Sequence, residues 1–158
     1  LPATLEQNQQ IQALVTAPLA ENSPVLTQGC CGEGNLVFNR KATASSEETP
    51  KNNFAPKAVD GRLDTRWCAA GPDSGQTLTL DMETPQSIRN VRIHWESRQT
   101  AYRYRLEASA NGTDWTTLAD HAENRRRNGL STDAVQADNV RYLKITFLGS
   151  NEIGRAHV

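Results

Sequence analysis

Residues 76–97, QTLTLDMETPQSIRNVRIHWES, contain two segments in which apolar and polar side chains alternate. In TLTLDM, at 77–82, every second residue is apolar, and in NVRIHW, at 90–95, Val91, Ile93 and Trp95 share one face. A period of two places successive side chains on opposite faces of an extended chain. The stretch therefore predicts two strands, each with one buried face.

The same period continues towards the C-terminus. YRLEAS, at 104–109, alternates, and the pair Asn111-Gly112 signals a hairpin turn before a strand that begins near Trp115. In VRYLKITF, at 140–147, we expect Tyr142 outside or at a rim and a core face that carries Arg141, Leu143, Ile145 and Phe147. Short strands separated by turns, with no convincing helix after residue 34, predict an all-β protein with an antiparallel β-sandwich.

The chain before residue 35 has a different character. Between Thr4 and Ala17 the apolar residues have a helical spacing, and Thr4 with Gln7 resembles a capping box. Pro18 and the glycine-rich run that follows would stop any helix. We therefore predict a helix within 4–17 and interpret residues 1–34 as the end of a preceding region and its linker.

Composition excludes several classes of function. The 17 Lys and Arg nearly balance the 18 Asp and Glu, so the protein lacks the positive field that attracts nucleic acid or anionic lipid. No apolar run approaches the roughly 18 residues of a membrane span, and the first residues do not resemble a signal peptide. The cysteines lack the spacing of a zinc site, and we expect free thiols; a bridge from Cys30 or Cys31 to Cys68 is the alternative.

Five segments, in this order and spacing, resemble discoidin domains, also called coagulation factor V/VIII type C domains. They are NLVFNRKATASS, NFAPKAVDGRLDTRWCAA, QTLTLDMETPQSIRNVRIHWES, YRYRLEASANGTDWTTL and VRYLKITFLG. The resemblance covers residues 35–151, and its bacterial members include carbohydrate-binding modules of family 32. It implies a jelly-roll β-sandwich of the galactose-binding-like kind, which agrees with the period of two.

The segment AVDGRLDTRW can be read in two ways. From the residues alone we favour an Asx turn, in which the Asp60 carboxylate bonds to its own backbone. The resemblance instead implies a structural calcium ion, because many bacterial members hold one here. It assigns the side chains of Asp60 and Thr65 and the carbonyls of Lys57 and Arg62 as ligands, and oxygen ligands are what calcium requires.

The resemblance also implies a sugar site on loops at one end of the sandwich, here 45–54, 69–76, 96–102 and 121–130. A sugar needs an apolar surface for its ring and charged or amide groups for its hydroxyls. We expect ligand contacts from Glu96, Arg98, Gln99, Tyr102, Arg126 and Asn128. The alternative is that these loops are solvated turns with weak surface ion pairs. We assign Trp67, Trp95 and Trp115 to core packing or loop anchoring.

The end of the chain departs from the family pattern. The family closes with a further strand that commonly carries an acidic calcium ligand, whereas this chain reads EIGRAHV after FLGSN. IGRAHV matches a translation of a short-read library adapter. We therefore interpret residues 152–158 as a non-native tail on a truncated metagenomic gene, which leaves the closing strand missing and makes Glu152 a doubtful ligand.

The sequence offers little for catalysis. His94, His121 and His157 are isolated, and no H-E-x-x-H, G-x-S-x-G or phosphate-binding glycine loop is present. We therefore expect a non-catalytic module that binds the terminal sugar of a glycan. It would be attached to a larger carbohydrate-active protein outside the cytoplasm, secreted, periplasmic or on the cell surface.

Two other functions stay open. The first is a structural or protein-interaction sandwich without sugar binding. The second is binding to membrane lipid, which requires exposed apolar loop tips, whereas the loops here are polar. We expect a glycan as partner and no nucleic acid, and this reading allows a catalytic domain in the same parent chain.

Overall fold

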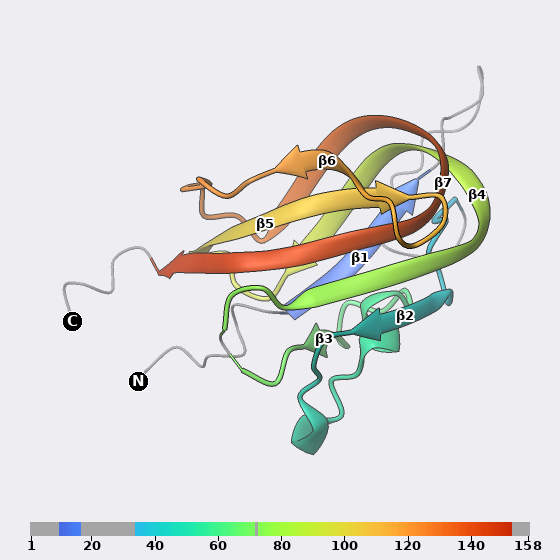
Figure 1. Cartoon of the computed structure of the whole chain (residues 1–158). Coiled ribbons are helices and arrows are strands. Elements are labelled where there is room, and N and C mark those ends of the chain that lie inside the picture. The colour runs from blue at the N-terminus through green and yellow to red at the C-terminus, as the bar shows by residue number, and fades with distance from the viewer. Residues whose placement is uncertain (1–9, 17–33, 72, 153–158) are drawn as a thin grey trace.

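The computed structural model describes residues 10–16, 34–71 and 73–152, and they form an all-β structure (Figure 1). The strands are β1 (Gln10–Thr16), β2 (Lys41–Ala44), β3 (Trp67–Cys68), β4 (Thr77–Trp95), β5 (Thr100–Ser109), β6 (Thr116–Asp120) and β7 (Leu130–Glu152). Two 3-10 turns, η2 (Thr49–Lys51) and η3 (Ala55–Ala58), precede β3. Nothing in the described ranges is a helix with the length and apolarity needed to cross a bilayer.

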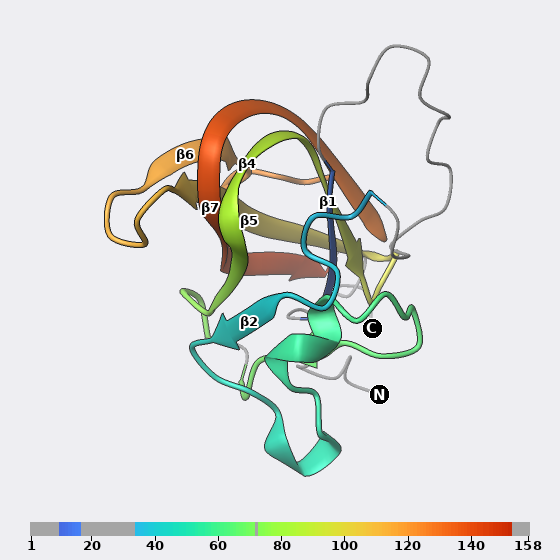
Figure 2. The ribbon, with the colours of Figure 1, turned by 90° about the vertical axis from the view of Figure 1, so that its right-hand side faces the viewer.

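The two longest strands build both layers of the sandwich. The order of hydrogen-bonded neighbours is β3-β1-β4-β7-β5-β6, with β2 also on β4, and all the pairs are antiparallel. The first half of β4 pairs with β2 and the end of β7, whereas its second half pairs with β1 and the start of β7. Both strands curve back on themselves (Figures 1 and 2), so one continuous sheet folds into two facing layers.

The bend of β4 and β7 has a definite local cause. The β4–β7 register shifts between Asp81 and Asn90, as β-bulges require, and bulges increase the twist of a strand. Glu83 and Asn139 have φ angles of 70° and 58°, in the left-handed region that few non-glycine residues adopt. The alternation also breaks here, because Val140 is buried, whereas Arg141, expected on the core face, has a side chain that is 40% exposed.

The core lies between the two layers and is made of the residues that alternate in the sequence. Leu78, Leu80 and Ile93 from β4 are fully buried, as are Leu106 from β5 and Leu143 from β7. Each such side chain contributes about 1.5–3 kcal/mol relative to exposure. The predicted inward faces of 77–82, 90–95 and 104–109 are confirmed, and so is that of 140–147 for Leu143, Ile145 and Phe147.

The predicted helix near the N-terminus is wrong for the residues that the structure describes. Gln10–Thr16 is strand β1, which pairs with β4 from Ile11 opposite Trp95 to Thr16 opposite Asn90. A short apolar run does not distinguish helix from strand by its period, and here the open edge of β4 decides. Thr4 and Gln7 lie outside the described residues.

The described residues include only part of the segments to which the predictions about the cysteines and the C-terminal tail apply. Cys68 is buried, while Cys30 and Cys31 lie outside the described residues, so the state of the thiols stays a prediction. Residues 153–158, most of the suspected tail, also lie outside them. The backbone of Glu152 pairs with Thr100 at the end of β7.

Candidate functional site

The ends of four strands bring two of the four predicted ligand-binding loops, 96–102 and 121–130, together at one end of the sandwich. Thr100 pairs with Glu152, and His94 pairs with Leu130, so the β4–β5 loop lies beside the β6–β7 loop. The two loops are also tied directly, since the Asn124 amide donates to the Tyr102 carbonyl at 2.7 Å. We call this end of the molecule, formed by residues 96–99 and 121–129, the rim (Figure 1).

Five of the six predicted contact residues are exposed on the rim: Glu96, Arg98, Gln99, Arg126 and Asn128. Glu96 lies 3.5 Å from the Arg66 guanidinium. The Arg98 side chain packs on Gly129, because a Cβ at Gly129 would lie only 2.7 Å from Arg98 Cγ. The Arg98–Gly129 contact holds the two loops next to each other, whereas the Arg66 contact ties Glu96 to the segment before β3.

The sixth predicted residue, Tyr102, occupies a different position from the others. Its side chain is 1% exposed, and its ring stacks on Trp95 with centroids 4.3 Å apart. Its hydroxyl accepts a hydrogen bond from the Ser97 N–H at 3.2 Å. This burial argues against direct contact with a ligand, and Tyr102 instead supports the β4–β5 loop from below.

A buried polar network beneath the rim was not predicted from the sequence. The Tyr104 hydroxyl donates to Asp133 Oδ2, and His121 Nε2 lies against Asp133 Oδ1, both at 2.6 Å. Burial, reinforced by the bond to Asp133, raises the pKa of Tyr104, so its hydroxyl stays protonated. Trp95 Nε1 donates to Ser131 Oγ at 2.7 Å beside this network.

The network fixes the start of the β6–β7 loop. The His121 N–H donates to the Tyr104 carbonyl at 2.8 Å, and the two rings are in tilted contact. The sequence analysis singled out neither Asp133 nor a strand at 131–139, where β7 in fact runs. The histidine partner comes from another strand end, so no local pattern could identify it.

The Asp60 turn has the hydrogen bond that the Asx reading predicts, and it brings together three oxygens that the calcium reading names as ligands. Asp60 Oδ1 accepts the Arg62 N–H at 3.0 Å, which is the expected Asx turn, and Gly61 has a φ of 77°. Thr65 Oγ1 donates to Asp60 Oδ2 at 2.6 Å and lies 3.3 Å from the Arg62 carbonyl oxygen. Three oxygens of different kinds therefore converge within one short loop.

These donors suit a hard cation in type, although they are fewer than the six to eight oxygens that calcium takes. The described residues contain no group of three or more His, Cys, Asp and Glu side chains placed to hold a metal. The Asp64 carboxylate is bound by the Arg62 guanidinium at 2.7 Å, a contact that lowers the pKa of Asp64. The N–H of Lys57, in η3, donates a hydrogen bond to the Phe54 carbonyl. The Lys57 carbonyl oxygen is the remaining predicted calcium ligand.

Comparison with known proteins relates this arrangement to one family. A family model described as F5/8 type C domain matches residues 41–157. Among curated proteins, no match to the chain was found.

Solved structures share the fold. Chitosan-binding module 1, from a chitosanase/glucanase of Paenibacillus sp. IK-5, has a TM-score of 0.62 and 26% identity, covering 73% of this chain and 92% of that one. CpGH89CBM32-4 of Clostridium perfringens, in complex with GlcNAc-alpha-1,4-galactose, has a TM-score of 0.63 and 16% identity, covering 72% and 78%. The CBM32 of AlyQ, in complex with 4,5-unsaturated mannuronic acid, has a TM-score of 0.60 and 23% identity, covering 72% and 86%.

Proposed function

This chain belongs to the F5/8 type C domain family, and we propose that it is a non-catalytic carbohydrate-binding module whose rim binds the terminal sugar of a glycan. The observation that carries the proposal is the convergence of two loops with exposed Glu96, Arg98, Gln99, Arg126 and Asn128 at one end of the sandwich. The three structural neighbours support it, because one is a chitosan-binding module and two are complexes with saccharides.

The chemistry of the rim suits a saccharide. A carboxylate such as Glu96 accepts hydrogen bonds from sugar hydroxyls, while a guanidinium such as Arg98 donates to two adjacent oxygens at once. Both groups project from loops that are fixed below by the Trp95–Tyr102 stack and the Asp133 network. A preorganised rim loses little conformational entropy on binding, which favours affinity.

We further propose that a calcium ion stiffens the edge next to the rim. The ion would be held by Asp60, Thr65 and the carbonyls of Lys57 and Arg62, and it would supply positive charge that fixes the loop, not chemistry on a substrate. The convergence of Asp60, Thr65 and Arg62 oxygens supports this assignment. The neighbouring Arg66 lies against Glu96, so the turn is linked to the rim by a short stretch of chain.

The module would act by attachment to a larger carbohydrate-active protein outside the cytoplasm. Binding of one part of a chain to a glycan raises the local concentration of any catalytic domain linked to it. The chitosan-binding neighbour, which derives from a chitosanase/glucanase, supports such an arrangement. A structural or protein-interaction role is the second candidate, and it predicts the same fold without saccharide binding.

A binding experiment separates these two functions. The purified chain is screened on a glycan array that includes neutral, amino and uronic sugars, and hits are measured by calorimetry. We expect saturable binding that Arg98→Ala weakens about tenfold, because a charged hydrogen bond is worth about 1.5–3 kcal/mol. The control is Arg40→Ala, an exposed arginine paired with Glu83 beside the strand bend. Binding to no glycan, or equal loss in both variants, would contradict the proposal.

A further inference from the structure

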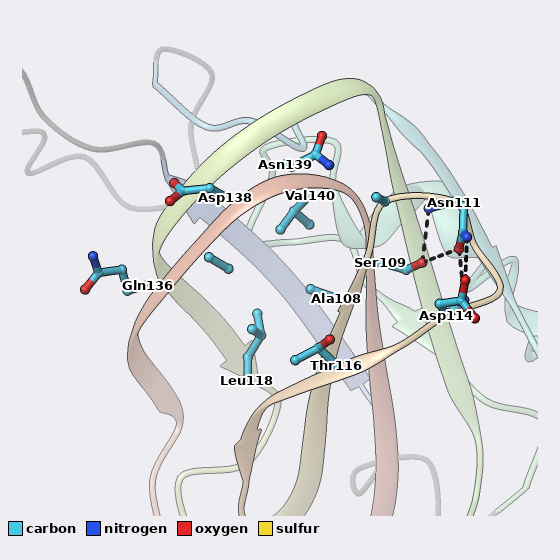
Figure 3. Close-up of a pocket in the computed structure, with 12 residues that line it drawn as sticks. Ala108, Ser109, Asn111, Asp114, Thr116, Leu118, Gln136, Asp138, Asn139 and Val140 are labelled. Carbon is cyan, nitrogen blue, oxygen red and sulfur yellow. Dashed lines mark hydrogen bonds between the residues drawn. The ribbon is translucent and has the colours of Figure 1, made fainter.

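A cavity of about 470 Å³ lies at the other end of the sandwich from the rim (Figure 3). One wall is the hairpin between β5 and β6, and the facing wall is the bend of β7 at residues 136–140. Strand β5 starts at the rim and ends at this hairpin, and its 10 residues span up to about 30 Å. The cavity shares none of its lining residues with the rim.

Hydrogen bonds fix the hairpin wall in one conformation. Ser109 Oγ accepts the backbone N–H groups of Asn111 and Gly112 at 3.2 and 2.8 Å. Asn111 Oδ1 accepts the N–H groups of Thr113 and Asp114, each at 2.9 Å, and its amide donates to Asp114 Oδ2 at 2.7 Å. The dashed lines in Figure 3 mark those bonds of this set that join Ser109, Asn111 and Asp114.

The facing wall belongs to the strained part of β7. Asn139, with a φ of 58°, marks the point where β7 passes from one layer to the other. Asp138 next to it is bound by Arg89 of β4 at 3.0 Å, and hydrogen bonds from Ser87 and Arg89 lower the pKa of Asp138. The hairpin wall is therefore held by bonds within the hairpin, and the facing wall by contacts to β4 outside the lining.

The lining combines an apolar floor with polar edges. Ala108, Leu118 and Val140 provide carbon surface, while Thr116 and Gln136 add a hydroxyl and an amide. This is the composition that suits a ligand with both C–H faces and hydrogen-bonding groups. A saccharide has both.

The charges of the lining add a further requirement. Asp114 and Asp138 are the charged residues of the lining, which contains no Lys, Arg or His. Arg89, which does not line the cavity, forms an ion pair with Asp138, whereas no ion pair in the described part of the chain includes Asp114. A carboxylate in a concave, partly apolar setting favours a cation over a neutral group.

We propose that this cavity is a second ligand site that takes a cationic amino sugar, with the ammonium group near Asp114 and the sugar ring over the apolar floor. The site goes beyond the proposed function because it uses no rim residue. A chain with both sites could contact two glycans, or two positions on one polysaccharide, and two linked sites increase avidity without new contacts.

Nuclear magnetic resonance of the full chain, labelled with ¹⁵N, tests the site. The probes are chitotriose, a glucosamine trimer, and its fully N-acetylated form, which keeps the ring and loses the charge. We expect chitotriose to shift the amide signals of Asn111, Asp114 and Asp138 saturably. We expect binding at these residues to weaken about threefold on acetylation and about threefold in Asp114→Asn, as for an exposed ion pair.

A matched pair of variants localises the binding. Thr116, on β6, lines the cavity, and its exposed neighbour Thr117 points to the opposite face of the strand. Thr116→Arg should abolish the shifts at the cavity, and Thr117→Arg should leave them unchanged. Absence of saturable shifts at the cavity, or equal behaviour of the two arginine variants, would overturn the proposal.

The same spectra separate this site from the rim. Shifts at Glu96 and Arg98 report the rim, and shifts at Asn111 and Asp138 report the cavity. Rim shifts without cavity shifts would overturn the second site and leave the proposed function intact. If the cavity shifts persist in Arg98→Ala and no glycan shifts the rim signals, the second site stands and the proposed function of the rim is overturned.

Discussion

Asp133 is the residue on which the floor of the rim depends. Its side chain is buried, and its two carboxylate oxygens receive Tyr104 from β5 and His121 from the end of β6. A buried hydroxyl that loses its acceptor keeps the cost of its desolvation without compensation. The rim loops are therefore held from below by one buried carboxylate.

Replacing this carboxylate should weaken the whole domain. We expect Asp133→Ala to lower the free energy of unfolding by about 1–3 kcal/mol, because it leaves the Tyr104 hydroxyl and the His121 ring without their partner. Urea denaturation, monitored by tryptophan fluorescence, measures this free energy of unfolding. The control is Asp138→Ala, an exposed carboxylate of the same strand with an ion pair to Arg89, which should cost less than about 1 kcal/mol. Equal effects would contradict this role.

At the scale of elements, the bend shared by β4 and β7 decides the architecture. Asp81, at the start of the bend, accepts two bonds from the Arg141 guanidinium at 2.9 and 3.1 Å and one from the Glu83 N–H at 2.8 Å. These contacts join the two long strands where both change layers. The bend also creates one wall of the cavity, so a single feature of the sheet positions both the core and the second site.

This bend should make stability sensitive to acid. The hydrogen bond from Arg141 lowers the pKa of Asp81 below its ordinary value, and a carboxyl with a lowered folded pKa stabilises the protein above its unfolded pKa of about 3.9. That stability is lost as the pH falls through the folded pKa. We expect Asp81→Asn to reduce the loss of unfolding free energy below about pH 4, measured by urea denaturation at several pH values. An unchanged acid profile in this variant would show that the pair does not hold the bend.

At the scale of the whole molecule, the two ends of the sandwich differ in character. The rim presents both signs of charge from Glu96, Arg98 and Arg126, whereas the cavity at the other end is lined by carboxylates without cations. The Asp60 turn, where we propose that calcium binds, is joined to the rim by the Arg66–Glu96 contact. A ligand that binds only the folded state stabilises it by mass action.

Calcium should therefore raise the thermal stability of the whole domain. With free calcium at about 100 times its Kd, the expected gain in unfolding free energy is about 2.7 kcal/mol. Scanning calorimetry with and without a chelator should show a higher Tm with calcium for the parent chain. Asp60→Ala should remove the difference, while Asp64→Ala should keep it, since Asp64 is bound to Arg62 instead of facing Thr65. A Tm shift of equal size in both variants would place the calcium elsewhere.

Much of the fold follows from local sequence, because a side-chain period of two needs only neighbouring residues. Leu78, Leu80, Val91, Ile93 and Leu106 are all buried, as their alternation predicts. The loops that form the rim were also predicted, since the family motifs place them between the strands. The strand β1 was not, because its apolar residues suit a helix as well, and only pairing with β4 decides between the two.

The candidate site likewise has features that the sequence predicts and features that depend on tertiary packing. Glu96, Arg98 and Asn128 lie on exposed loops, as the sequence indicates, but the burial of Tyr102 against Trp95 depends on how the end of β4 meets the start of β5. The contact of His121 with Asp133 joins residues 12 positions apart through the packing of β5, and the cavity joins a hairpin to a strand bend. The sequence by itself determined the strands at 77–82, 90–95, 104–109 and 140–147 and their apolar faces. Only the tertiary structure decided which polar groups meet, because those contacts depend on long-range pairing that no local pattern records.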